Sequence, residues 1–191
     1  MIETAETICR FWLKECGPDA WYSGGGELDT RIRDRFEPSW QAAMDGRLVR
    51  WTNSPRGSLG YLILTDQFPR NMFRGTPRAF ASDRLALCAA KRAIRDGFDR
   101  EVEGAARQFF YMPLEHSELG PDQHRAVRLF ASRTASDDLL LHARAHREII
   151  RRYGRFPYRN EALGRTSTAS ERAMLEDGAY GGVLRELQAA A

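Results

Sequence analysis

The sequence predicts an all-α fold of about eight helices, arranged as a single domain over residues 1–191. Apolar residues recur three and four positions apart in most segments, and glycine or proline separates these segments. No run of six residues alternates apolar and polar positions with β-branched side chains, and residues 48–51 are the only short strand-like stretch. With 191 residues, 42% of them hydrophobic, the chain is long enough to bury one core.

The first half of the chain gives five helical segments. Residues 4–16 carry apolar side chains at helical spacing and are stopped by Gly17, and the glycine-rich segment 18–26 is expected to be irregular. Ser54 and Thr76 each precede a proline, an arrangement that starts helices because the first helical position needs no N–H. We expect helices over residues 4–16, 28–37, 40–45, 55–67 and 77–96.

The second half gives four further segments and a helical tail. Residues 99–111 are predicted to form a helix that Pro113 breaks, and Gly120 opens the next one, to residue 131. Asp137 or Asp138 is expected to cap the helix 139–153, with Gly154 as its C-terminal stop. A short helix from residue 168 or 170 to 177 and a fragment after residue 180 complete the chain.

Composition excludes several classes of protein. The net charge is +3 and acids are interspersed with bases, unlike the basic stripe of a nucleic-acid binder. Only Lys14 and Lys91 are lysines among 29 basic residues, and the other 27 are arginines. The simplest explanation is the base composition of the genome; the alternative is that some arginines make two-pronged contacts that lysine cannot make. We therefore expect no nucleic-acid partner. The oligomeric state is left open.

The expected location is the cytoplasm, and no membrane contact is expected. Three cysteines are too few for a disulfide framework, and Cys9 and Cys16 lie about 10 Å apart along a helix. The charged start of the chain does not resemble a signal peptide, and no window approaches the roughly 20 apolar residues of a membrane span.

One short motif occurs twice. The N-terminal motif, residues 66–76, begins Asp-Gln-Phe-Pro-Arg-Asn, and the C-terminal motif, residues 156–166, begins Phe-Pro-Tyr-Arg-Asn. Each lies between two helical segments, which indicates duplication of a helix–loop–helix unit around 55–95 and 137–177. Stacked helix pairs form a superhelix whose concave face binds partners.

Several charged residues fall on apolar helix faces. Asp66, Asp83, Glu171, His142 and His146 share a face with buried-type neighbours, and a carboxylate removed from water needs a partner. The two motifs and the residues beside them offer four arginines as partners: Arg70, Arg74, Arg159 and Arg165. These arginines either clamp the loops to the carboxylates or, together with Asn71 and Asn160, hold an anionic ligand.

A third polar cluster spans Glu115 to Glu118, and His142 and His146 are four positions apart. A metal site is conceivable, but the histidine pair lacks the intervening glutamate of a zinc protease, and core histidines are commoner. Ser117 has no glycine-flanked elbow, and Gly24–Gly26 lack the lysine of a phosphate loop. We predict no metal and no cofactor.

With the two motifs and Tyr-Met-Pro-Leu-Glu-His-Ser-Glu at 111–118, the chain resembles the bacterial family called domain of unknown function 924. The resemblance covers nearly the whole chain. It implies a helical superhelix similar to tetratricopeptide repeats, and it brings no activity, substrate or cofactor. Tyr158 departs from the histidine frequent there, which weakens any role for that ring.

The leading hypothesis is a helical-repeat protein whose arginine-rich pocket binds a small anionic ligand or a peptide carboxylate. The motif segments 66–76, 111–118 and 154–165 are expected to line one cavity. The candidate ligand-binding residues are Asp66, Gln67, Arg70, Asn71, Arg74, Glu115, His116, His146, Arg159, Asn160 and Arg165.

Two alternatives remain. The first is a hydrolase-type enzyme that uses Glu115 or Glu118 with His146 for acid–base chemistry. The second is an interaction scaffold without a small-molecule site, in which the polar clusters only stabilise loops. Whether the protein is an enzyme stays open.

Overall fold

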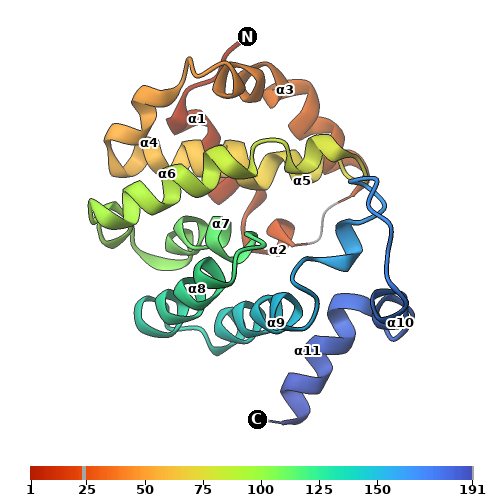
Figure 1. Ribbon diagram of the computed structural model, residues 1–191. Coiled ribbons are helices and arrows are strands. Elements are labelled where there is room, and N and C mark those ends of the chain that lie inside the picture. Colours follow the sequence, from red (N-terminus) through yellow and green to blue (C-terminus); the bar gives the residue numbers. More distant parts are fainter. Residues whose placement is uncertain (23–24, 191) are drawn as a thin grey trace. The chain divides into compact units, whose positions relative to one another are not determined.

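The computed structural model describes residues 1–22 and 25–190, and every regular element in these ranges is helical (Figure 1). The predicted all-α class is confirmed. The described ranges contain eleven α-helices rather than about eight, together with short 3₁₀ and π segments. The additional helices are pieces of four or five residues, too short to show a helical period. The expected irregular segment 18–26 begins with one of them, and Ser23 and Gly24 lie outside the described residues.

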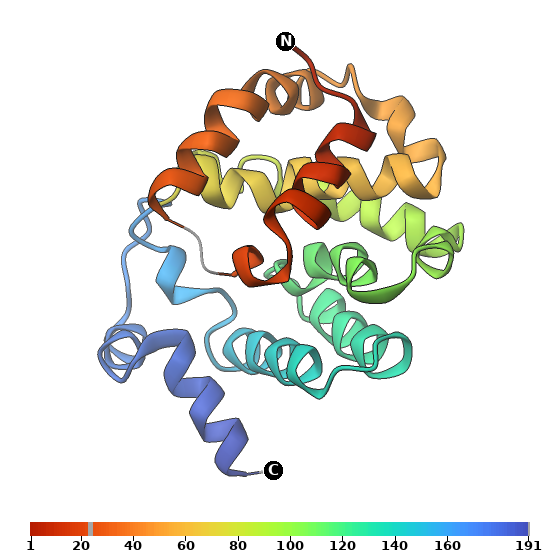
Figure 2. The ribbon, with the colours of Figure 1, turned by 180° about the vertical axis from the view of Figure 1, so that it is seen from behind.

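The chain divides into two compact units, Met1–Pro113 and Leu114–Ala191. The N-terminal unit holds six complete α-helices: α1 (Ala5–Arg10), α2 (Pro18–Trp21), α3 (Gly26–Met44), α4 (Pro55–Leu62), α5 (Phe68–Met72) and α6 (Asp83–Arg95). Within it α1 packs against α4, α3 against α5, and α4 against α6 (Figure 2). Helix α7 (Met112–Glu115) spans the division.

Aromatic rings fill the core of the N-terminal unit. Phe68 contacts Phe11, Trp12 and Phe36, with ring centroids 6.0, 5.4 and 4.8 Å away. Glycine permits the closest helix approach: a Cβ at Gly60 of α4 would lie 2.7 Å from the carbonyl oxygen of Ala5 in α1. The predicted start of α4 is confirmed, since the Ser54 side chain accepts the Gly57 N–H and Pro55 opens the helix.

Helix α3 corrects the expectation that Pro38 separates two helices. The helix runs unbroken from Gly26 to Met44 with Pro38 inside it. Proline removes one helical hydrogen bond, but Ile32, Phe36 and Trp40 are buried along the helix on both sides of it. The burial of these three side chains offsets that local cost, which local sequence rules do not weigh.

Four other parts of the chain differ from expectation. Residues 77–96 form a 3₁₀ turn, Pro77–Phe80, followed by α6, so Asp83 begins a helix instead of lying within one. The segment 99–111 forms two 3₁₀ stretches, Phe98–Glu101 and Gly104–Phe110, because Val102 and Glu103 adopt extended backbone. The strand-like residues 48–51 belong to the 3₁₀ segment Val49–Asn53 and the residue before it. Pro113 lies inside α7 rather than ending a helix.

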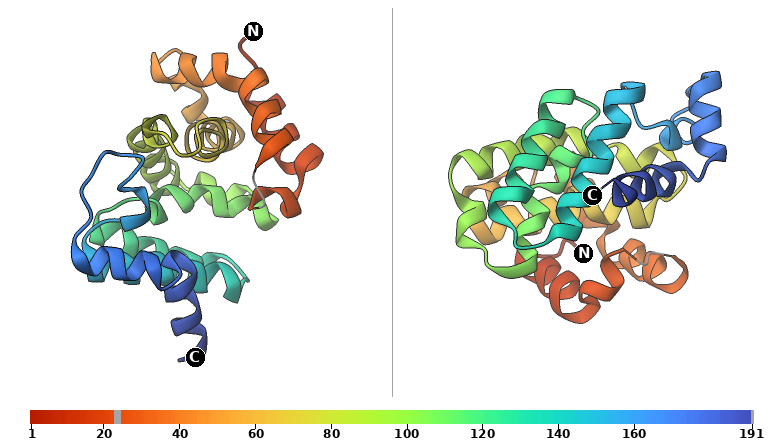
Figure 3. Two further views of the ribbon diagram at one scale, coloured as in Figure 1. Left: turned by 90° about the vertical axis from the view of Figure 1, so that its right-hand side faces the viewer. Right: turned by 90° about the horizontal axis from the view of Figure 1, so that it is seen from below.

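The C-terminal unit holds α8 (Gly120–Arg133), α9 (Asp137–Tyr153), α10 (Ala169–Glu176) and α11 (Ala179–Ala189). Helices α8 and α9 lie side by side, and α11 packs on α9 (Figure 3). Ser136, not Asp137 or Asp138, caps α9, because its hydroxyl accepts the Leu139 N–H. Gly154 ends α9 with a left-handed φ of 70°, as predicted, and of the two expected starts of the next helix it is Thr168 that caps α10.

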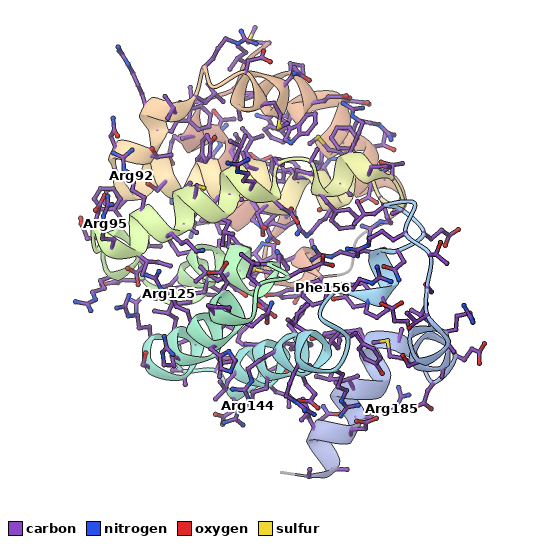
Figure 4. All side chains as sticks on the ribbon, in the orientation of Figure 1. Arg92, Arg95, Arg125, Arg144, Phe156 and Arg185 are labelled. Carbon is purple, nitrogen blue, oxygen red and sulfur yellow. The ribbon has the colours of Figure 1, made fainter. Side chains whose placement is uncertain are left out.

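The core of this unit lies where α9, α10 and α11 meet. Phe156, in the segment between α9 and α10, is fully buried among Ile149, Ile150, Met174 and Val183. Figure 4 labels Phe156 among the ribbons of this unit, while Arg144 and Arg185 extend from them. The first residue of the C-terminal motif is therefore part of the hydrophobic core of its unit.

Candidate functional site

The backbone of the N-terminal motif explains part of its side-chain chemistry. Pro69 has no N–H, so the carbonyl oxygen of Thr65, four residues earlier, cannot accept the i+4 hydrogen bond of an α-helix. The Ser82 hydroxyl donates to that oxygen at 2.6 Å and accepts the Trp40 indole N–H at 2.9 Å. A π-helical segment, Ile63–Gln67, precedes the proline. The motif is thus tied to α3 and to the start of α6.

Arg70 lies between two carboxylates. Its Nη1 is 3.0 Å from Asp83 Oδ1 and 3.5 Å from Asp66 Oδ1, and it donates to the Asp66 carbonyl oxygen at 2.5 Å. The Asp66 side chain is 1% exposed, as predicted, whereas that of Asp83 is 25% exposed. Gln67 donates to Asp66 Oδ2 at 2.5 Å and contacts Met112 Sδ at 3.5 Å. This geometry is that of a buried clamp.

The other polar residues of the N-terminal motif converge on Asp29, which sequence reasoning missed. Asn71 donates to Asp29 Oδ1 at 2.8 Å, and Arg74 donates to its two oxygens at 3.3 and 3.0 Å. Partial burial raises the pKa of Asp29, but the bonds from Arg74 and Asn71 outweigh it and hold this pKa below its usual value. Asp29 lies in a highly charged stretch of α3, where nothing in the sequence distinguishes it.

Glu171 is buried as predicted, but its partner is neither Arg159 nor Arg165. Arg155, just before the C-terminal motif, donates to the two Glu171 oxygens at 2.6 and 2.8 Å. This pair and the Thr168 N–H lower the pKa of Glu171 to about 2. The prediction failed because Arg155 follows the helix-ending Gly154 directly and so reaches the start of α10.

Arg165 and Glu118 form a two-pronged ion pair. Arg165 Nη1 and Nη2 lie 2.8 and 3.0 Å from the Glu118 oxygens, and Glu118 also accepts the Phe156 N–H at 2.8 Å. Burial raises the pKa of Glu118, yet the Arg165 and Phe156 donors hold it below its usual value. Glu118 therefore anchors the C-terminal motif to the segment after α7.

The remaining two candidates of this motif are buried. Arg159 places its guanidinium 4.4 Å from the centre of the Phe156 ring, a cation–π contact. Asn160 donates to Ser167 Oγ at 3.0 Å, while its buried Oδ1 has no hydrogen-bond partner among the described residues. Both side chains therefore lie inside the unit.

Glu115 and His146 are brought together, although 31 positions separate them in the sequence. Glu115 Oε1 lies 2.7 Å from His146 Nδ1, and the two side chains are 6% and 15% exposed. His146 Nδ1 also lies 3.0 Å from the carbonyl oxygen of His142. The buried Gln123 amide donates to the Glu115 and Ser117 carbonyl oxygens, at 2.6 Å each, and so fixes the segment that carries Glu115.

The neighbours of Glu115 favour the ionised form of its carboxyl group. Burial raises the pKa of this carboxyl, but the nearby histidines, His146 first, outweigh burial and lower it. The ring of His116 lies 6.1 Å from that of His146. Glu115 is thus suited to orient His146.

Tyr180 of α11 completes this group, and sequence reasoning missed it. Its hydroxyl lies 2.5 Å from His142 Nδ1, and its ring centre lies 4.8 Å from that of His146. Tyr180 sits in a glycine-rich tail with no motif around it. We call these five residues the histidine cluster: Glu115, His116, His142, His146 and Tyr180.

The histidine cluster contains residue types that bind metals but does not have the geometry of a metal centre. Among the described residues, no group of three or more histidine, cysteine, aspartate or glutamate side chains has the geometry to hold a metal ion. Cys9, Cys16 and Cys88 are free thiols. What the cluster offers is a carboxylate, imidazoles and a phenol, the groups of proton transfer and hydrogen bonding.

Each unit also has an open groove. The groove in the N-terminal unit has a volume of about 600 Å³, and its lining includes Trp21, Pro55 and Val102. The groove in the C-terminal unit has a volume of about 470 Å³, and its lining includes Arg155, Thr168 and Glu171. None of the predicted ligand-binding residues lines either groove. The expected single cavity for the three motif segments stays a prediction, since 66–76 lies in the N-terminal unit and 154–165 in the other.

In the described ranges, no helix combines the length and hydropathy needed to cross a membrane. Among curated proteins, none matches this chain. A solved structure of a protein of unknown function from Agrobacterium tumefaciens is similar, with 42% identity and a TM-score of 0.86 over 91% of this chain and 97% of that one. The model of the family described as bacterial protein of unknown function (DUF924) matches residues 8–179. The chain belongs to this family.

Proposed function

We propose that the protein is a hydrolase-type enzyme in which His146 is the general base and Glu115 orients it. The observation that carries this proposal is the 2.7 Å contact between Glu115 Oε1 and His146 Nδ1. A buried carboxylate on one imidazole nitrogen fixes the ring and favours the protonated form that arises when the other nitrogen accepts a proton.

The partners of His146 support one assignment of its hydrogen atom. Both groups at Nδ1, the Glu115 carboxylate and the His142 carbonyl, are hydrogen-bond acceptors, so Nδ1 carries the hydrogen. Nε2 then keeps its lone pair. In the part of the chain that the structure describes, no residue makes a hydrogen bond with Nε2. This nitrogen is therefore available to a water molecule or a substrate.

The reaction follows from this assignment. His146 Nε2 takes a proton from water while the water oxygen bonds to an electrophilic carbon, such as a carbonyl carbon, whose π electrons move to oxygen. When the tetrahedral intermediate collapses, His146 returns the proton to the leaving atom. Glu115 stays ionised throughout and stabilises the intervening imidazolium. The Phe156 and Tyr180 rings, 5.5 and 4.8 Å from the His146 ring, limit water around it.

A small anionic molecule or a peptide carboxylate is the substrate class we propose. Arg159 belongs to the same unit as His146 and places its positive charge over the Phe156 ring, whereas Arg165 is paired with Glu118. The arginines of the N-terminal motif are engaged with Asp66, Asp83 and Asp29, which favours a structural role for Arg70 and Arg74. Ligand recognition is thus assigned to the C-terminal motif.

The test is a screen for hydrolysis followed by paired variants. The purified protein would be assayed with p-nitrophenyl esters, phosphates and glycosides, and with short peptides by release of free amines. For the best substrate, His146→Gln is expected to lower kcat/KM by about 100-fold or more. His124→Gln is the control, because His124 is exposed on α8 and, among the described residues, its Nδ1 contacts only the Gly120 carbonyl.

Two results would count against the proposal. Absence of any hydrolysis would favour a scaffold, in which the polar clusters serve only to hold loops. Unchanged kcat/KM in His146→Gln would move the chemistry away from the histidine cluster.

The arrangement we propose for the fold is a superhelix similar to tetratricopeptide repeats, within one domain and with an internal duplication around 55–95 and 137–177. The α8–α9 pair, joined by three residues, supports the helix-hairpin unit. We also propose the cytoplasm as its location, which the three free thiols support.

A further inference from the structure

We infer that His142 and His146 are held in opposite tautomers, so that His142 Nε2–H donates a hydrogen bond to the oxygen that gains charge when His146 acts as base. Tyr180 is the positioning residue that sets the His142 tautomer. This inference rests on the proposed function of His146 and adds a second group to the same site.

The two histidines share one face of α9. They are four positions apart, a spacing that places their Cβ atoms about 5–6 Å from each other. Both rings contact the same phenol: the Tyr180 ring stacks on His142 at 5.9 Å and lies 4.8 Å from His146. A single functional group of a substrate, such as a carbonyl, can therefore contact both imidazoles.

The Tyr180 hydroxyl acts as a donor to His142. Burial, and after it the negative charge of Glu115, raises the pKa of Tyr180 well above its ordinary value, so the phenol keeps its proton. It lies 2.5 Å from His142 Nδ1, and in the arrangement that we infer its O–H donates to that nitrogen. His142 Nδ1 thus carries the lone pair, which leaves the hydrogen on Nε2.

Asp138 favours the same tautomer from the other side of the ring. Its Oδ1 lies 3.7 Å from His142 Nε2, where its negative charge favours an N–H over a lone pair. The Asp138 side chain is 78% exposed, so it can turn into water and release the N–H to a substrate. His142, 36% exposed, is then a hydrogen-bond donor at the edge of the cluster.

A neutral imidazole N–H is suited to stabilising charge rather than to giving up its proton. As the water oxygen bonds to the substrate carbon and its proton passes to His146 Nε2, the carbonyl oxygen becomes negative, and the His142 N–H donates to it. No proton leaves His142. On collapse of the intermediate the electron pair returns, the bond to the leaving atom breaks, and His146 supplies the proton.

The test reads the tautomers directly. Long-range ¹H–¹⁵N correlation spectra of the four histidines, recorded at mildly alkaline pH, distinguish a protonated Nδ1 from a protonated Nε2. His142→Gln and His146→Gln assign the two signals. The expected result is Nδ1–H for His146 and Nε2–H for His142.

Tyr180→Phe removes the hydroxyl and keeps the ring. We expect it to shift His142 to a mixture of tautomers, leave the His146 signals in place, and lower kcat about tenfold with KM little changed. Tyr153→Phe is the matched control, because Tyr153 lies on α9 and packs against the same core. It should change neither the tautomers nor kcat.

Nδ1–H on His142 in the wild-type protein, or His142 signals unchanged by Tyr180→Phe, would overturn the inference. Such a result leaves the proposed function intact if His146→Gln still abolishes hydrolysis. The converse result is also informative. If the two histidines have opposite tautomers but His146→Gln leaves hydrolysis unchanged, the tautomer assignment is supported and the catalytic roles of both histidines are contradicted.

Discussion

The N-terminal and C-terminal motifs carry the same residue types and meet different partners. In the N-terminal motif, Arg70 is held by Asp66 and Asp83. In the C-terminal motif, Arg159 lies over the Phe156 ring, and that ring packs edge-on against His146. The first motif thus ends in closed ion pairs, and the second borders a carboxylate–imidazole pair.

The difference shows that a motif's function depends on the chemistry of its neighbours. The N-terminal copy is surrounded by carboxylates, each of which needs a cation, so its arginines are used within the fold. Near the C-terminal copy, Arg155 binds Glu171 and the motif's own Arg165 binds Glu118, while Arg159 lies over an aromatic ring. The neighbouring His146 makes both of its polar contacts through Nδ1.

The largest effect is expected for Arg70→Met. Removing the guanidinium takes the ion-pair partner from the buried Asp66 and from Asp83, which should lower the free energy of unfolding by about 3–5 kcal/mol. Tryptophan fluorescence during urea denaturation is a suitable probe, because all four tryptophans precede residue 114 and lie in the N-terminal unit. Arg84→Met, on the exposed side of α6, is the control and should change this free energy by less than about 0.5 kcal/mol. A loss below about 1 kcal/mol for Arg70→Met would mean that the clamp is not structural.

Arg165→Met probes the equivalent ion pair in the C-terminal unit. Glu118 is 29% exposed, so water can replace part of the lost contact, and we expect a smaller loss of about 1.5–3 kcal/mol. Far-UV circular dichroism during urea denaturation measures it, with the exposed Arg144→Met as control. A loss larger than that of Arg70→Met would reverse the comparison between the motifs.

The Arg155–Glu171 pair should make the stability of the fold depend on pH in the acidic range. Because the folded-state pKa of Glu171 is about 2, below its ordinary value of 4.5, its contribution is complete above about pH 4.5 and is lost as the pH falls towards 2. Glu171→Gln should therefore lose less stability than the wild type over this range, as measured by melting temperature. Parallel pH curves for the two proteins would show that Glu171 does not contribute in this way.

Local signals in the sequence were sufficient for the fold class and for several helix ends. Ser54, Gly154 and Thr168 act as predicted because caps and stops depend on residues only a few positions apart. Helix α3 was split wrongly at Pro38, since the burial that keeps it continuous is a tertiary effect. The number of helices was underestimated for the same reason: four- and five-residue helices owe their form to packing.

The sequence offered Glu115 or Glu118 as the carboxylate for His146 and left the choice open, since no rule of spacing links positions on different elements. In the structure Glu115 contacts His146, and Glu118 pairs with Arg165. Asp29 and Tyr180 were missed because each is an unremarked residue in its own segment and gains its role only from a partner elsewhere in its unit. The clamp around Asp66 and Asp83 was one of the two roles that the sequence left open for the arginines, because a carboxylate on an apolar face requires a nearby cation.

The most direct test of the contrast between the motifs is the specific activity of Arg70→Lys. The lysine keeps the charge but loses the planar two-pronged contact with Asp66 and Asp83, so the melting temperature should fall. Hydrolysis of the best substrate, measured at a temperature where the variant is fully folded, is predicted to stay within about twofold of the wild type. A tenfold or larger fall in kcat/KM, about 1.4 kcal/mol, in the fully folded variant would contradict the account, because Arg70 would then contribute to the site and not only to the fold.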